Sequence, residues 1–183
     1  MKHFDSKHLI FIDESGANLR MSNLYARAEG GSRIKMPVPF DRGTQFSMIG
    51  AISINKVEAA LYGEWATNGD IFHIFVEKIL LPKLKPKHIV IMDNVKFHLQ
   101  ARIKETIESV GAKIIFLPPY SPDLNPIENM WSKIKNTLRK LAPRTARSFK
   151  KCIKVAFEEV SKNDLVGWYA HCGYRGGFVR IPL

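Results

Sequence analysis

The sequence predicts one α/β domain built around a mixed sheet, and three features indicate this fold class. Residues 9–12 and 89–92 are short, continuously apolar runs, which is typical of strands buried on both faces. A helical pattern separates the second run from a third at 114–117, and strand–helix–strand connections are parallel and right-handed. Residues 46–53 and 57–65 are separated by only a few residues, which indicates an antiparallel hairpin.

The remaining segments have helical periodicity. Residues 68–82 predict a helix that starts at Asn68 and ends at Pro82. A second helix closes at Gly111, the usual type of residue just past a helix end, and its expected apolar face carries Leu99, Ile103, Ile107 and Val110. A third begins at Asn125-Pro126 and is expected to bury Ile127, Met130, Trp131, Ile134, Leu138 and Leu141. The chain beyond it is helical and basic, with a buried stripe expected at Phe149, Ile153, Ala156, Phe157 and Val160.

Composition narrows the class of protein. The chain has 183 residues, and 28 Lys and Arg against 17 Asp and Glu give a net charge of +11, which favours a polyanionic partner such as nucleic acid. The two cysteines lack a metal-ligand spacing, and reduced thiols fit a cytosolic protein. There is no signal peptide and no apolar run of membrane-spanning length, so the expected location is the cytoplasm, with nucleoid association if the source is bacterial. A P-loop and a dinucleotide-binding glycine motif are both absent, which argues against nucleotide-binding classes.

Residues 14–44 interrupt the regular pattern with a basic segment punctuated by Gly and Pro. A connection of this length inside one domain favours a functional loop or hairpin. It would clamp nucleic acid or a partner chain through Arg27, Arg33 and Lys35, although a merely solvated loop explains the pattern equally well. Further cations suited to phosphates follow Glu128 in the chain: Lys133, Lys135, Arg139, Lys140, Arg144 and Arg147.

Three acidic residues are expected to meet at one edge of the sheet. Asp13 and Asp93 each end an apolar run, and two such strands placed side by side and parallel bring both to the edge where open α/β sheets bind ligands. Glu128 lies in the first turn of the helix that begins beyond the third run. Strand-ending aspartates are also common turn formers. A glutamate at the third helical position, after Asn125 as N-cap, equally fits a capping box.

Carboxylates that converge without a nucleophile–base pair suggest a site for a hard cation. Magnesium prefers oxygen ligands and keeps several waters, so carboxylates and substrate phosphate complete its shell. Two such ions about 4 Å apart can promote in-line displacement at phosphorus. The sequence therefore predicts phosphoryl-transfer chemistry at Asp13, Asp93 and Glu128.

The residues around these carboxylates resemble the signature of mariner-like DDE transposases, especially the bacterial insertion-sequence branch. The resemblance rests on Asp93-Asn94 with His98, on residues 116–131 (FLPPYSPDLNPIENMW), and on the 34 residues between Asp93 and Glu128. It implies a ribonuclease H-like fold with a mixed five-stranded sheet, and Mg²⁺ or Mn²⁺, as two ions, at Asp13, Asp93 and Glu128. It also implies supporting roles near the metal for Asn94, His98 and Asn125.

The same resemblance implies a reaction and partners. The enzyme would cut DNA at the ends of a transposon and join the freed 3′-hydroxyls to target DNA, as a homodimer or higher multimer. Family members carry an amino-terminal helix-turn-helix region, whereas this chain begins directly at the catalytic domain. Either the element encodes a separate helix-turn-helix recognition subunit, or the chain is a remnant or an excised domain. We expect residues 1–183 to be a single catalytic domain, with the 14–44 segment as an insertion and 142–183 as a basic, aromatic C-terminal extension. A ribonuclease H-like nuclease without strand transfer and a non-catalytic DNA-binding remnant stay open as alternatives, although the intact carboxylates count against decay.

Overall fold

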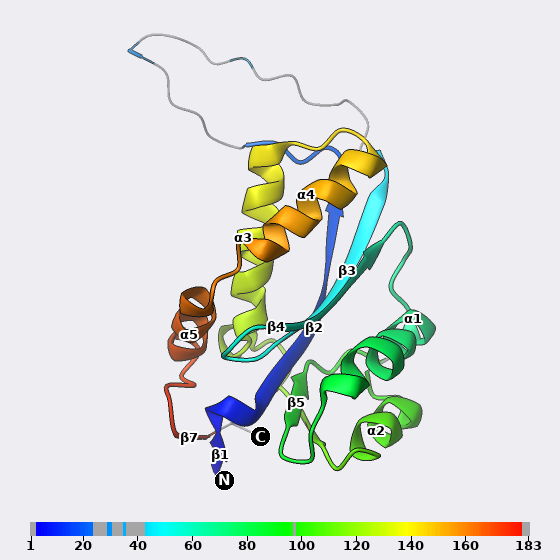
Figure 1. The fold of residues 1–183 in the computed structure, drawn as a ribbon, viewed down its shortest axis with the longest axis vertical. Coiled ribbons are helices and arrows are strands. Elements are labelled where there is room, and N and C mark those ends of the chain that lie inside the picture. The colour runs from blue at the N-terminus through cyan, green and yellow to red at the C-terminus, as the bar shows by residue number, and fades with distance from the viewer. Residues whose placement is uncertain (1–2, 24–28, 31–34, 36–42, 97, 181–183) are drawn as a thin grey trace.

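The computed structural model describes residues 3–23, 29–30, 35, 43–96 and 98–180. They form a five-stranded sheet with helices on both faces (Figure 1). Along the sheet the strands are β4 (Val57–Gly63), β3 (Gln45–Ile52), β2 (Leu9–Asn18), β5 (Ile89–Met92) and β6 (Lys113–Phe116). β2, β5 and β6 are parallel, whereas β3 and β4 form the antiparallel hairpin. The predicted mixed five-stranded α/β fold is confirmed.

Each face of the sheet is covered by a different group of helices (Figure 1). On one side lie α2 (Ala101–Glu108) and α1 (Gly69–Ile74), which continues as a π-helical turn, η2 (Phe75–Leu80), and a 3-10 turn, η3 (Leu81–Lys83). Asn68 caps α1 as predicted, accepting hydrogen bonds from the backbone N–H of Asp70 and Ile71. On the other side lie α3 (Pro126–Leu141), α4 (Ala146–Glu158) and α5 (Lys162–His171).

The central strand β2 contributes to both hydrophobic cores because its side chains alternate between the faces. Leu9 and Phe11 pack in the cluster that contains α3, α4 and α5, whereas Ile10 and Ile12 pack in the cluster that contains α1 and α2. By the same alternation Asp13 faces α3 and Glu14 faces the opposite side. The two consecutive acidic residues, Asp13 and Glu14, therefore contact different helices and loops on opposite faces of the sheet.

A separate two-stranded sheet joins the ends of the chain. β1 (His3–Asp5) pairs antiparallel with β7 (Phe178–Arg180), with His3 opposite Arg180. Short 3-10 turns, η1 (Ser6–His8) and η4 (Pro122–Leu124), complete the described elements. Strands from near the beginning and the end of the chain accordingly lie side by side (Figure 1).

Three expectations about the elements were wrong. β2 does not end at Asp13 but runs to Asn18, because β3 continues to pair with it beyond Phe11, where pairing with β5 stops. The first residues of the predicted 14–44 excursion are thus strand. Leu99 precedes α2 and is 54% exposed, and Leu141, the last residue of α3, is 46% exposed.

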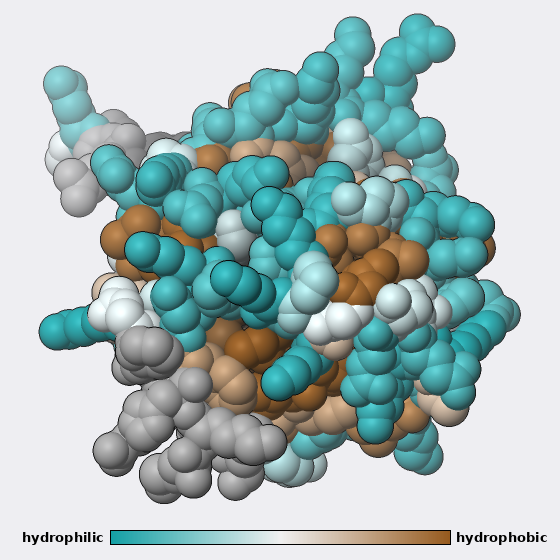
Figure 2. Space-filling view, turned by 60° about the horizontal axis from the view of Figure 1, so that its bottom comes forward, coloured by the Kyte–Doolittle hydropathy of each residue, from teal (hydrophilic) through white to brown (hydrophobic). Residues whose placement is uncertain are grey.

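The segment after α3 is part of the core. Phe149, Ile153 and Ala156 of α4 are buried as predicted, and Tyr169, Cys172 and Tyr174 pack in the same cluster as β2. Seen from the side of the termini, the surface is largely hydrophilic, with apolar side chains in separate patches between polar ones (Figure 2). In the described part of the chain, none of the helices is long and apolar enough to cross a membrane.

Candidate active site

Asp13 lies in the middle of β2 and faces α3, where its side chain is 8% exposed. Its Oδ2 accepts a hydrogen bond from Trp131 Nε1 of α3 at 3.1 Å. Burial and the negative charges of Glu128, Glu14 and Asp93 raise the pKa of Asp13 from 3.8 to about 8. A cation beside Asp13 would therefore stabilise the ionised form of its carboxyl group.

Gly50 provides the space for this contact. It lies opposite Asp13 in the β2–β3 pairing, and the indole ring of Trp131 lies against it. A Cβ atom at position 50 would come within 2.9 Å of Trp131 Cη2, closer than side chains pack. The absence of a side chain there lets the indole reach across β3 to Asp13.

Asp93 directly follows β5, as predicted, and its orientation is set by His98. His98 Nδ1 lies 2.7 Å from Asp93 Oδ1, and the Val95 N–H donates to the same oxygen at 3.3 Å. His98 Nε2 lies 2.8 Å from Glu14 Oε1, and the ring is buried. The imidazole thus connects the end of β5 to β2.

The protonation states of His98 and Asp93 depend on each other. Burial alone would lower the pKa of His98, but the hydrogen bonds to Asp93 and Glu14 raise it to about 9. Burial opposes ionisation of Asp93, yet the hydrogen bond and positive charge of His98 bring the pKa of Asp93 below its usual value. A protonated His98 between two carboxylates is the arrangement that this geometry favours.

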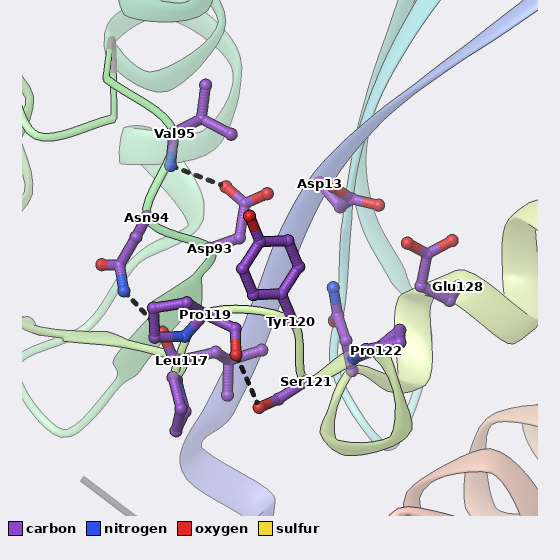
Figure 3. Close-up of a pocket in the computed structure, with 12 residues that line it drawn as sticks. Asp13, Asp93, Asn94, Val95, Leu117, Pro119, Tyr120, Ser121, Pro122 and Glu128 are labelled. Atoms are coloured by element: carbon purple, nitrogen blue, oxygen red, sulfur yellow. Dashed lines mark hydrogen bonds between the residues drawn. The ribbon is translucent and has the colours of Figure 1, made fainter.

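Glu128 stands at the third position of α3 and does not form the capping box that its spacing allowed. Asn125 occupies the N-cap, as predicted, but its side chain makes no capping hydrogen bond. Asn125 is instead buried, and its Oδ1 has no hydrogen-bond partner among the described residues. The carboxylates of Glu128 and Asp13 point toward the same space (Figure 3).

One cavity of about 520 Å³ brings the predicted residues together. Asp13, Asp93, Glu128, Asn94 and Asn125 all line it, together with the loop after β6 (Figure 3). Asn94 Nδ2 donates to the Leu117 carbonyl at 2.8 Å, which ties the end of β5 to the end of β6. His98 does not line the cavity but contacts Asp93, which does.

The donor set of the cavity fits a hard divalent cation. It offers carboxylate oxygens from separate elements and the unpartnered, buried amide oxygen of Asn125, which are the ligand types that Mg²⁺ and Mn²⁺ prefer. Within the described residues, no three His, Cys, Asp or Glu side chains are close enough together to enclose a metal ion. The carboxylates are thus arranged around the cavity and do not converge on one point.

The predicted DNA-binding residues are distributed outside this cavity. Lys35 is exposed, and Lys135 and Arg139 are partly exposed on α3, whereas Arg27 and Arg33 lie outside the described residues. Two other cations expected to contact phosphate make contacts within the protein. Lys133 Nζ pairs with Asp164 at 2.6 Å, and Arg144 Nη1 donates to the carbonyls of Leu19 and Met21, both at 2.9 Å.

Glu14, Gly50 and Trp131 are site residues whose roles the sequence did not reveal. Each acts on a partner far away in the chain: Glu14 on His98, Gly50 on Trp131, and Trp131 on Asp13. The alternation of β2 could have shown that Glu14 faces away from Asp13. Nothing local indicates which side chain it meets there.

A family model described as DDE superfamily endonuclease matches residues 8–151, most of the chain and all three carboxylates. No curated protein sequence matches the chain.

Solved structures of Mos1 transposase share the fold. The Mos1 strand transfer complex matches with a TM-score of 0.72 and 15% identity, over 91% of this chain and 52% of the Mos1 chain. The Mos1 paired end complex with Mg gives 0.72 and 16%, over 92% and 53%. The catalytic domain of Mos1 mariner transposase gives 0.67 and 14%, over 91% and 78%. The chain spans about half the length of the Mos1 chain in the strand transfer and paired end complexes, and the match identifies the ribonuclease H-like fold.

Proposed function

The chain belongs to the DDE superfamily of endonucleases, and from that premise we propose that it cuts DNA as the catalytic domain of a transposase. The observation that carries the proposal is the shared cavity. Asp13, Asp93 and Glu128, from β2, the end of β5 and the start of α3, all line it. No nucleophilic side chain is needed when carboxylates hold a divalent cation beside a phosphodiester.

The chain's own residues would have separate tasks. Asp13, Asp93 and Glu128 would hold Mg²⁺ or Mn²⁺, two ions by analogy with the family, and Asn125 Oδ1 would accept a hydrogen bond from a bound water or the substrate. His98 keeps Asp93 oriented, and Trp131 keeps Asp13 oriented. When bound, the cations would polarise the scissile phosphate and the attacking water or 3′-hydroxyl.

The proposed substrate is DNA at the ends of a transposon, with strand transfer into target DNA as the second reaction. The net charge of +11 suits binding to a polyanion. The matched Mos1 structures are of a strand transfer complex and paired end complexes, one with Mg and one with Mn. By extension we propose that this chain acts as a multimer on DNA, and that it represents the bacterial insertion-sequence branch.

Asp93→Asn tests the proposal. Cleavage and joining of labelled end-containing DNA in Mg²⁺ or Mn²⁺ should fall to background, because the carboxylate acts through the metal. DNA affinity should stay near that of the wild type because binding depends on Lys and Arg. Asp70→Asn is the matched control, since Asp70 pairs with Arg102 at the surface and does not line the cavity.

A second readout does not depend on activity. Mn²⁺ should raise the melting temperature of the wild type by mass action, and the rise should be smaller for Asp93→Asn and unchanged for Asp70→Asn. If Asp93→Asn cuts DNA as fast as the wild type, this cavity is not the site of cleavage. Cleavage without joined products from pre-cut ends would leave a nuclease without strand transfer.

A further inference from the structure

Tyr120 is an unusual feature of the cavity because its ring is entirely exposed. Its side chain shows 102% of the reference area, whereas the other exposed large apolar residues among those described show 38% to 54%. Tyr169 and Tyr174, by contrast, are buried. A tyrosine ring is a large, flat, partly apolar surface that is normally covered.

The ring lies at the proposed cleavage site. Tyr120 lines the same cavity as the three carboxylates, and Figure 3 shows its ring in the space between Asp93 and Glu128. Val95, which is 38% exposed, lines the cavity as well. Acidic groups for cutting a phosphodiester and an uncovered flat ring are therefore neighbours.

The loop that carries Tyr120 holds it in a conformation that a tyrosine rarely adopts. Its φ is +57°, in the left-handed region. Pro118, Pro119 and Pro122 restrict the φ angles around it. Both ends of the loop are anchored, by the hydrogen bond from the Leu117 N–H to the Met92 carbonyl at 2.9 Å and by that from the Tyr174 hydroxyl to the Leu124 carbonyl at 2.8 Å. Such local strain is found where a site needs a residue held in place.

We infer that Tyr120 stacks on a nucleobase that has left the base stack beside the phosphodiester to be cut. This inference rests on the proposed function and names the part of the DNA that the cavity recognises. The hydroxyl of Tyr120 can donate a hydrogen bond to a phosphate, as other polar side chains do, but its uncharged ring matches the flat face of a base. Inside a duplex both faces of each base are covered by its neighbours. The ring therefore finds an open face only where a base is unpaired or at a break.

Two properties follow from the chemistry of stacking. Every base has a flat face, so the contact should tolerate any base at that position. Stacking also releases no counterions, so its contribution should be similar at low and high salt, unlike that of Lys135. These properties distinguish Tyr120 from the basic residues of the same protein.

The experiment measures binding in EDTA, so that no cleavage occurs. The probes are a fully paired duplex and a duplex with one unpaired 2-aminopurine next to a strand break. For the wild type we expect tighter binding of the second DNA and quenching of its fluorescence. At low and at high salt, Tyr120→Ala and Tyr120→Gly should bind the second DNA about tenfold more weakly than the wild type, and the quenching should disappear. Tyr120→Phe and Tyr120→Trp should keep the tighter binding and the quenching.

The glycine variant separates the ring from the loop, because glycine adopts a φ of +57° without strain. If Tyr120→Gly keeps the wild-type preference and quenching, the inference is overturned. An equal loss of affinity for the fully paired duplex would also overturn it, since it would place the ring on intact DNA. Val166→Ala, which removes an exposed apolar side chain on α5, should change neither measurement.

The inference and the proposed function fail separately. If the wild type cuts no DNA in Mn²⁺ but shows ring-dependent binding of the unpaired base in EDTA, the cleavage proposal fails and the stacking inference stands. If the wild type cuts and all Tyr120 variants bind like it, only the stacking inference fails.

Discussion

His98 is held between two carboxylates that approach it from different strands. Asp93 follows β5 and Glu14 belongs to β2, and both ring nitrogens of His98 lie within 2.8 Å of a carboxylate oxygen. Because the ring is buried, losing either carboxylate would remove a short hydrogen bond from a place that water does not reach. Glu14 therefore supports Asp93 although it does not line the cavity.

Glu14→Ala should lower the free energy of unfolding by about 1–3 kcal/mol, since it removes the charged acceptor at 2.8 Å from the buried His98 Nε2. Glu14→Gln should cost less because the amide oxygen still accepts a hydrogen bond. Urea denaturation in EDTA measures both. Glu77→Ala, which removes the same side chain from a surface pair with Lys78, should change stability by no more than about 0.5 kcal/mol. Equal effects of Glu14→Ala and Glu77→Ala would show that the His98 contact has no structural weight.

At the scale of elements, α3 is joined to α5 by one aspartate. Asp164 Oδ2 accepts hydrogen bonds from Lys133 Nζ of α3 at 2.6 Å and from Ser161, the N-cap of α5, at 2.8 Å from its N–H and 2.7 Å from its hydroxyl. The hydrogen bond from Lys133, followed by those from Ser161, lowers the pKa of Asp164 from 3.8 to about 2. The same carboxylate therefore caps the N-terminus of α5 and holds α3 against it.

Asp164→Asn should lower the free energy of unfolding by about 1 kcal/mol at neutral pH. The folded pKa lies below the unfolded one, so this stabilisation is complete above about pH 4 and is lost as the pH falls toward 2. Urea titrations at several pH values should show the difference between wild type and variant shrinking over that interval. A difference that is constant from pH 7 to 2 would contradict a role for the charge. Asp70→Asn, in the first turn of α1, should show little difference at any pH.

At the scale of the whole molecule, the sequence predicts what is local. Buried strands have continuous apolar runs in the sequence, and helices have periodic ones. The order of the elements, and the positions of Asp93 and Glu128 in it, therefore follow from the pattern. Recognising Asp13, Asp93 and Glu128 as one set depended on the family motif as well. The structure brings all three to one cavity.

The remainder depends on contacts between distant segments. β2 extends past Asp13 because β3 pairs with it to Asn18, and no residue of 14–18 signals this by itself. The partners of the catalytic candidates are equally remote in sequence: 118 positions separate Trp131 from Asp13, and 84 separate His98 from Glu14. The exposure of Tyr120 likewise depends on the fold around its loop.

The pairing of β1 with β7 brings the first and the last strand of the chain next to each other. The Cα atoms of His3 and Arg180 are opposite each other in the register, which places them about 5 Å apart. A short glycine–serine linker could therefore connect Arg180 directly to His3, and new ends could be opened between Asn55 and Lys56, which are exposed in the turn from β3 to β4.

Such a circular permutant should fold and melt within a few degrees of the parent, because every core contact is kept. Circular dichroism during heating measures this. A permutant opened inside β2, between Phe11 and Ile12, is the control that should not fold, since it cuts the strand on which both cores and Asp13 depend. If the first permutant also fails to fold, the order in which the strands are connected is essential to this domain.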